Sequence, residues 1–131
     1  QNEFYGEFAN DVETVNAIKS VYENYHYLMD PHTAVAYSVY EKLDNSNLDK
    51  NIHTVIMSTA HPFKFPTPIA KALGLDETKE PYAILDEVSK VTGVKFPEKL
   101  TEVRNSEIRF SNVIDKAEIQ DFVKKYINDL K

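Results

Sequence analysis

Cysteine is missing from this 131-residue sequence, and that absence excludes several kinds of site. Without cysteine a chain has no disulfide framework, no thiolate zinc site and no cysteine nucleophile. A reducing, intracellular setting is the simplest interpretation, and we expect a cytoplasmic protein.

Long apolar runs and excess positive charge are missing too. No stretch approaches the roughly 20 apolar residues that span a bilayer, and no basic region followed by a hydrophobic one opens the chain. The formal net charge of -6 repels nucleic acid and anionic lipid. We therefore expect neither a nucleic-acid nor a membrane partner. A hydrophobic content of 42% is enough for one core. Because the chain opens with Gln1 and not Met, we expect a piece of something longer.

Two segments carry a capping box followed by an apolar stripe, the pattern of an amphipathic helix. The first begins at Asn10 with Glu13 three residues on, and the second begins at Asp115 with Glu118. The stripes are Val15, Ile18, Tyr22 and Tyr25 in the first, and Ile119, Phe122, Tyr126 and Leu130 in the second.

Proline and glycine mark three further helices. Asp30 is a suitable N-cap before Pro31, and the segment that runs on to Leu43 is apolar on more than one face, so we expect it to be largely buried. The segment 65–75 predicts a short helix that ends at Gly74. The segment 80–93 predicts another, with Pro81 at its start and Gly93 just past its end.

The run HTVIMST, residues 53–59, predicts a strand, because it is short, β-branched and unalternating, as a strand buried on both faces would be. Helix, loop and buried strand in succession indicate an α/β layer around a short, mostly parallel sheet. A further short strand is expected at residues 107–113.

Polar residues follow the predicted strand. Ligands of open α/β sheets bind at the carboxyl ends of strands, where Ser58 and Thr59 are expected to lie. Their hydroxyls could equally cap the following turn. His61 and Lys64 likewise have structural alternatives, as a loop imidazole bonded to backbone and as a solvated ammonium. The four histidines show no metal-ligand spacing, so no metal site is predicted.

Two motifs, DPHTAVAY at residues 30–37 and STAHPFKFP at residues 58–66, closely resemble the C-terminal part of threonine synthase. The resemblance covers the chain from about residue 10 onward. It implies a three-layer αβα enzyme of fold type II that uses pyridoxal phosphate to convert O-phospho-L-homoserine and water to L-threonine and phosphate. Thr59 resembles the residue that meets the cofactor's ring nitrogen, with Ser58 as second choice. Lys64 and His61 would lie near the substrate or its phosphate.

The family's Schiff-base lysine and glycine-rich phosphate loop belong to an N-terminal motif that this sequence does not contain. The resemblance therefore implies that residues 1–131 are a C-terminal fragment of a larger two-domain enzyme, inactive alone and not expected to bind the cofactor by itself. Its partners would be the N-terminal part of the same chain and, through uncovered apolar surface, a second copy. Two alternatives remain open: a catalytically empty α/β binding or regulatory module, and another fold type II enzyme such as threonine dehydratase.

Overall fold

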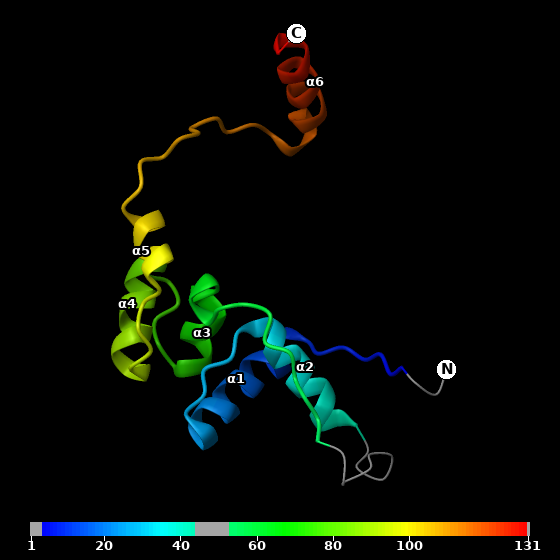
Figure 1. The fold of residues 1–131 in the computed structure, drawn as a ribbon, viewed down its shortest axis with the longest axis vertical. Coiled ribbons are helices and arrows are strands. Elements are labelled where there is room, and N and C mark those ends of the chain that lie inside the picture. The colour runs from blue at the N-terminus through cyan, green and yellow to red at the C-terminus, as the bar shows by residue number, and fades with distance from the viewer. Residues whose placement is uncertain (1–3, 44–52, 131) are drawn as a thin grey trace.

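The computed structural model describes residues 4–43 and 53–130, and all the elements within them are helical (Figure 1). The α-helices are α1 (Asp11–Tyr25), α2 (Pro31–Lys42), α3 (Pro66–Leu73), α4 (Pro81–Thr92), α5 (Glu98–Arg104) and α6 (Ile119–Asp129). Two short 3-10 turns, η1 (Pro62–Lys64) and η2 (Lys116–Glu118), precede α3 and α6. None of the described helices is long and apolar enough to cross a membrane.

The predicted helix starts and stops are confirmed. Both capping boxes form, at Asn10 with Glu13 and at Asp115 with Glu118. Asp30 caps α2 with its carboxylate, and Pro31 is the first helical residue. Gly74 and Gly93 end α3 and α4 in the left-handed conformation, with φ of 69° and 71°. Local side-chain and backbone chemistry is therefore sufficient to set these boundaries.

Two expectations about burial and helix content need correction. Helix α2 is not largely buried: only Thr33, Ala34 and Ser38 are buried, and Ala36 is exposed. Its buried face packs against α1. Helix α5 forms within a segment for which the sequence predicts no helix.

The predicted strands are wrong for the described residues. Residues 53–59 form neither helix nor strand, and Val55 and Met57 are 77% and 72% exposed. Residues 107–113 are likewise irregular and exposed. A strand forms only when a second strand pairs with it, and no described segment pairs with either run. The parallel sheet, and with it the α/β layering, is therefore not seen in the part of the chain that the structure describes.

One core joins the first four helices. Helix α1 packs against α2 and α3, and α3 packs against α4. The fully buried side chains at the centre include Ile18 of α1, Ile69 of α3, Val88 of α4 and Phe63 of η1. Arg104 ties α5 to α4 through a bidentate pair with Asp86, at 2.9 and 3.1 Å. The core thus lies within residues 14–88, with half-buried cover as far as Leu100.

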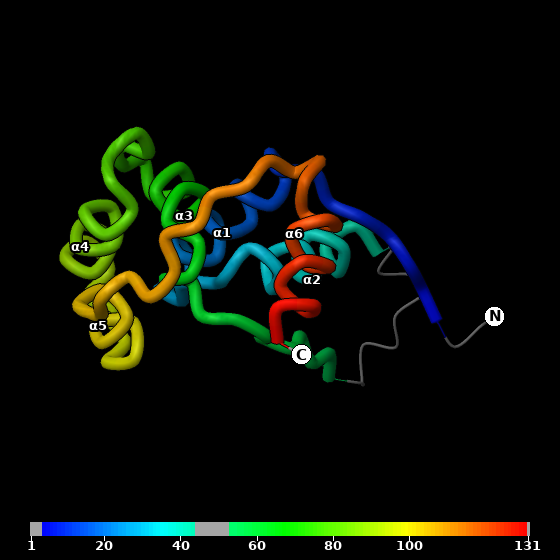
Figure 2. The backbone as a smooth tube through the Cα atoms, turned by 90° about the horizontal axis from the view of Figure 1, so that it is seen from above, coloured from blue at the N-terminus to red at the C-terminus, as the bar shows by residue number. Residues whose placement is uncertain are grey.

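Helix α6 lies apart from this core, at the end of the extended segment that follows α5 (Figure 1). Figure 2 traces this segment from α5 to α6 in the view from above. It has no buried residue, although its apolar side chains gather along one face. Tyr126 and Leu130 of that face are 60% and 70% exposed. The predicted amphipathic helix is confirmed, and its apolar face is uncovered.

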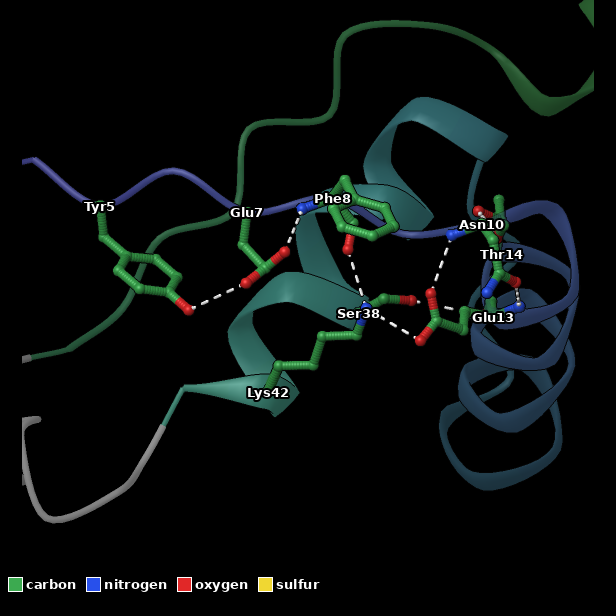
Figure 3. A network of polar contacts seen from close by, with 8 residues as sticks. All are labelled: Tyr5, Glu7, Phe8, Asn10, Glu13, Thr14, Ser38 and Lys42. Carbon is green, nitrogen blue, oxygen red and sulfur yellow. Dashed lines mark hydrogen bonds and ion pairs between the residues drawn. The ribbon is translucent and has the colours of Figure 1, made fainter.

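The Lys42 side chain of α2 contacts both the segment before α1 and α1 itself (Figure 3). The Lys42 Nζ donates to the Phe8 carbonyl and to Glu13 Oε1, each at 2.8 Å. The Lys42 bond, together with the backbone N–H of Asn10, lowers the pKa of Glu13 below its usual value. This contact fixes the direction in which the chain enters the helical core.

Candidate functional site

The start of α2 holds a buried carboxylate whose hydrogen bonds can all be traced. Asp30 is 1% exposed. Its Oδ1 accepts from the backbone N–H groups of His32 at 2.9 Å and Thr33 at 3.4 Å. Its Oδ2 accepts a very short hydrogen bond from the Thr33 hydroxyl. The Asp30 carboxylate therefore caps α2 and also binds the Thr33 side chain.

Burial and hydrogen bonding act in opposite directions on Asp30. Burial raises the pKa of its carboxyl, but the Thr33 hydroxyl and the N–H groups of His32 and Thr33 outweigh it, so the net pKa lies below the usual value. Asp30 is thus an anion at neutral pH, held in place by four donors when the His32 ring is included.

His32 bonds locally, to Asp30 two residues before it. Its Nδ1 lies 3.2 Å from Asp30 Oδ1, and its ring packs edge-on against Phe65 with centroids 5.0 Å apart. The side chain is 64% exposed and borders a groove of about 550 Å³ whose lining also includes Phe65 and Lys71. The starts of α2 and α3 meet along this groove.

Asp30, His32 and Thr33 form a group of hydrogen-bonded residues that we call the Asp30 cluster. Ser58 is the predicted site residue that contacts it. The hydroxyl oxygens of Thr33 and Ser58 lie 3.4 Å apart. The segment that carries the STAHPFKFP motif therefore runs beside the start of the DPHTAVAY helix. Ser58 and Thr59, which follow one another in the chain, are both exposed to solvent.

His61 and Lys64 lie at the two ends of η1. His61 caps η1, with its Nδ1 accepting from the Phe63 N–H at 3.2 Å. Lys64 is exposed at the end of that turn. Within residues 4–43 and 53–130, no hydrogen bond joins either side chain to the Asp30 cluster, and no three His, Asp or Glu residues group as a metal site.

Sequence reasoning missed the side-chain role of Asp30 and Thr33. Asp30 was predicted only as a helix cap, and Thr33 only as part of a motif. Their spacing holds the signal, because a carboxylate at the N-cap lies within reach of a hydroxyl three residues on, in the first turn. The contact from Thr33 to Ser58 joins residues 25 apart and has no such local signature.

Comparison with known proteins agrees with the two motifs. Residues 33–127 match the family described as threonine synthase, C-terminal. The chain is 33% identical over 112 residues to threonine synthase of Saccharomyces cerevisiae, covering 81% of this chain and 22% of that protein. It is 38% identical over 73 residues to threonine synthase of Schizosaccharomyces pombe, covering 56% of this chain and 14% of that protein. It is 39% identical over 80 residues to threonine synthase-like 1 of Mus musculus, covering 61% of this chain and 10% of that protein.

The chain thus spans between a tenth and about a fifth of the length of these three relatives. The family match covers most of the chain and includes α2 from Thr33, the Ser58 segment and α3 to α5. The chain belongs to the threonine synthase C-terminal family.

Proposed function

We propose that this chain is the C-terminal part of a pyridoxal-phosphate-dependent threonine synthase, a lyase that converts O-phospho-L-homoserine and water to L-threonine and phosphate. The family match over residues 33–127 carries the proposal, because it spans the first motif from Thr33 onward and the whole of the second. The contact between Thr33 and Ser58 supports it, since one site needs both motifs close together.

The described residues fit one part of a cofactor site. Ser58 and Thr59 offer neutral hydroxyls of the kind that can bond a ring nitrogen without keeping it protonated. The three glycines Gly6, Gly74 and Gly93 lie on separate parts of the chain, with open space around each, so they do not form a phosphate cradle. The missing lysine and phosphate loop would come from the N-terminal part of the same protein.

Four residues of this chain, Ser58, Thr59, His61 and Lys64, each have a role in the proposal. The bound cofactor supplies electron withdrawal from the substrate's carbon centres. The Thr59 hydroxyl orients the ring by bonding its nitrogen, and Ser58 holds the neighbouring backbone against α2. Lys64 adds positive potential toward the substrate phosphate. His61 keeps the loop in shape through its bond to the Phe63 N–H.

The test compares the full-length protein that carries this chain with residues 1–131 alone. We expect phosphate release and threonine formation from O-phospho-L-homoserine in the full-length protein with pyridoxal phosphate, and none from the fragment. A full-length protein that lacks a cofactor-binding lysine, or that releases no phosphate, would favour the catalytically empty binding module instead.

Thr59 is tested in that full-length protein with three substitutions. Thr59→Ser keeps the hydroxyl and should preserve most activity. Thr59→Val removes the bond at a cost of about 0.5–1.5 kcal/mol in cofactor binding. Thr59→Asp should shift the cofactor's absorption, because a carboxylate favours a protonated ring nitrogen. Thr54→Val, on the same exposed segment, is the matched control and should leave both readouts unchanged.

A further inference from the structure

The Asp30 cluster and Ser58 form a chain of hydrogen-bonded groups that begins at the Asp30 carboxylate. Asp30 is a carboxylate with a fully buried side chain, and it can only accept hydrogen bonds. Oδ2 takes the Thr33 hydroxyl, and Oδ1 takes two backbone N–H groups. From Thr33 the chain continues 3.4 Å further to the Ser58 hydroxyl.

Counting hydroxyl protons fixes the direction of the second contact. A threonine hydroxyl carries one proton and two lone pairs. The proton of Thr33 points to the Asp30 carboxylate, because a bond to an ionised acceptor is both shorter and stronger than one to a neutral hydroxyl. Distance alone would let either hydroxyl donate across the 3.4 Å contact, but only Ser58 has a proton left for it.

We propose that Asp30 is a positioning residue that acts through Thr33 to turn the Ser58 proton inward, so that Thr59 is the hydroxyl of the pair that donates to the cofactor's ring nitrogen. The inference rests on the proposed function for its second half. Its first half, the coupling of Asp30, Thr33 and Ser58, concerns this chain alone.

Asp30→Asn separates helix capping from this coupling. Asparagine is as good an N-cap as aspartate, so α2 keeps its start. Its side-chain amide, however, would donate to Thr33, and the Thr33 proton would then turn toward Ser58. The Ser58 proton would point outward in consequence. Aspartate and asparagine at position 30 have nearly the same shape. They therefore differ mainly in the direction that they impose on the hydroxyl protons of Thr33 and Ser58.

The first experiment measures pyridoxal phosphate binding by absorbance titration in the full-length protein. Thr33→Val should weaken binding about three- to ten-fold, as expected for the loss of one neutral hydrogen bond, and Thr33→Ser should restore it. Asp30→Asn should weaken binding to a similar degree with unchanged helical circular dichroism. Thr14→Val removes a hydroxyl from another buried helical threonine, one bonded to the Asn10 carbonyl, and should bind as wild type. Wild-type binding by Thr33→Val would overturn the proposal.

The second experiment needs no cofactor. A double-mutant cycle of Thr33→Val and Ser58→Ala is measured by urea unfolding of the same full-length protein without pyridoxal phosphate. We expect the two substitutions to be non-additive by about two- to ten-fold in the unfolding equilibrium constant, because they remove the same contact. Strict additivity would refute the coupling. If the wild-type protein binds no pyridoxal phosphate, the proposed function fails, and this cycle still decides whether Thr33 and Ser58 act together.

Discussion

Phe63 anchors the loop after Ser58 and Thr59 to the helical core, and Phe63→Ala should release it. The Phe63 side chain is 2% exposed. Its ring packs edge-on against Phe96 with centroids 5.4 Å apart, and against His61 at 5.3 Å. Because Phe63 is the buried residue of η1, the substitution tests both stability and the placement of the site.

The cost follows from two contributions. Returning the buried ring to water costs about 1.5–3 kcal/mol, and the void left by alanine raises typical Phe→Ala losses to about 3–5 kcal/mol. Phe96 is only partly buried and can move into the void, so we expect a loss near the lower end, about 3 kcal/mol. That is a large share of the roughly 5–15 kcal/mol that stabilises an ordinary domain.

The assay is urea unfolding of the 131-residue chain followed by circular dichroism. Phe110→Ala is the matched control, because Phe110 is 81% exposed and should change the free energy of unfolding by no more than about 0.5 kcal/mol. A loss below about 1 kcal/mol for Phe63→Ala, or an equal loss for both variants, would refute the assignment of Phe63 to the core.

Three further predictions concern pH, a helix end and the C-terminal segment. Burial raises the pKa of Asp30, but its hydrogen bonds lower the pKa by more than burial raises it. Its contribution to stability is therefore complete above about pH 5 and is lost as the pH falls through its folded pKa, so Asp30→Asn should lose less unfolding free energy than wild type between about pH 5 and pH 2 in urea titrations. Gly93→Ala should lower the free energy of unfolding by about 1 kcal/mol, because the φ of Gly93 is 71°. Gly6→Ala, in open space, is the control and should change the free energy of unfolding by less than about 0.5 kcal/mol. Equal melting temperatures for the two variants would contradict this prediction. Ending the chain after Asn105 should change the free energy of unfolding by less than about 1 kcal/mol, since none of residues 106–130 is buried, and a larger loss in urea unfolding would show that α6 contributes to the core.

Sequence patterns predict the helix boundaries well here because those boundaries depend on neighbours in the chain. Asn10, Asp30 and Gly93 act within one helical turn, so their chemistry can be recognised without knowing the fold. The run at residues 54–59 has an equally clear preference, but a strand needs partners, and none of the described segments pairs with it.

In the candidate site, too, features that depend on neighbours in the chain can be predicted from the sequence, and contacts between distant residues cannot. The two motifs are visible in the sequence, and the helix cap at Asp30 follows from its place before Pro31. The contact between Thr33 and Ser58 depends on how the segment after residue 53 returns past α2, which local patterns do not determine. Sequence reasoning therefore finds the members of the site but not which hydroxyl faces which.

The packing of α1 on α2, and of α3 on α4, also bears on how the chain folds. Each of these pairs joins helices that follow one another in the sequence, and the packing of α1 on α3 bridges a longer stretch of chain. Chains dominated by contacts between near neighbours have little loop-closure entropy to overcome, and they fold in microseconds to milliseconds. The helical pairs should therefore form early, with the closing of α3 onto α1, which brings Phe63 and the Ser58 segment to the start of α2, as the slower step.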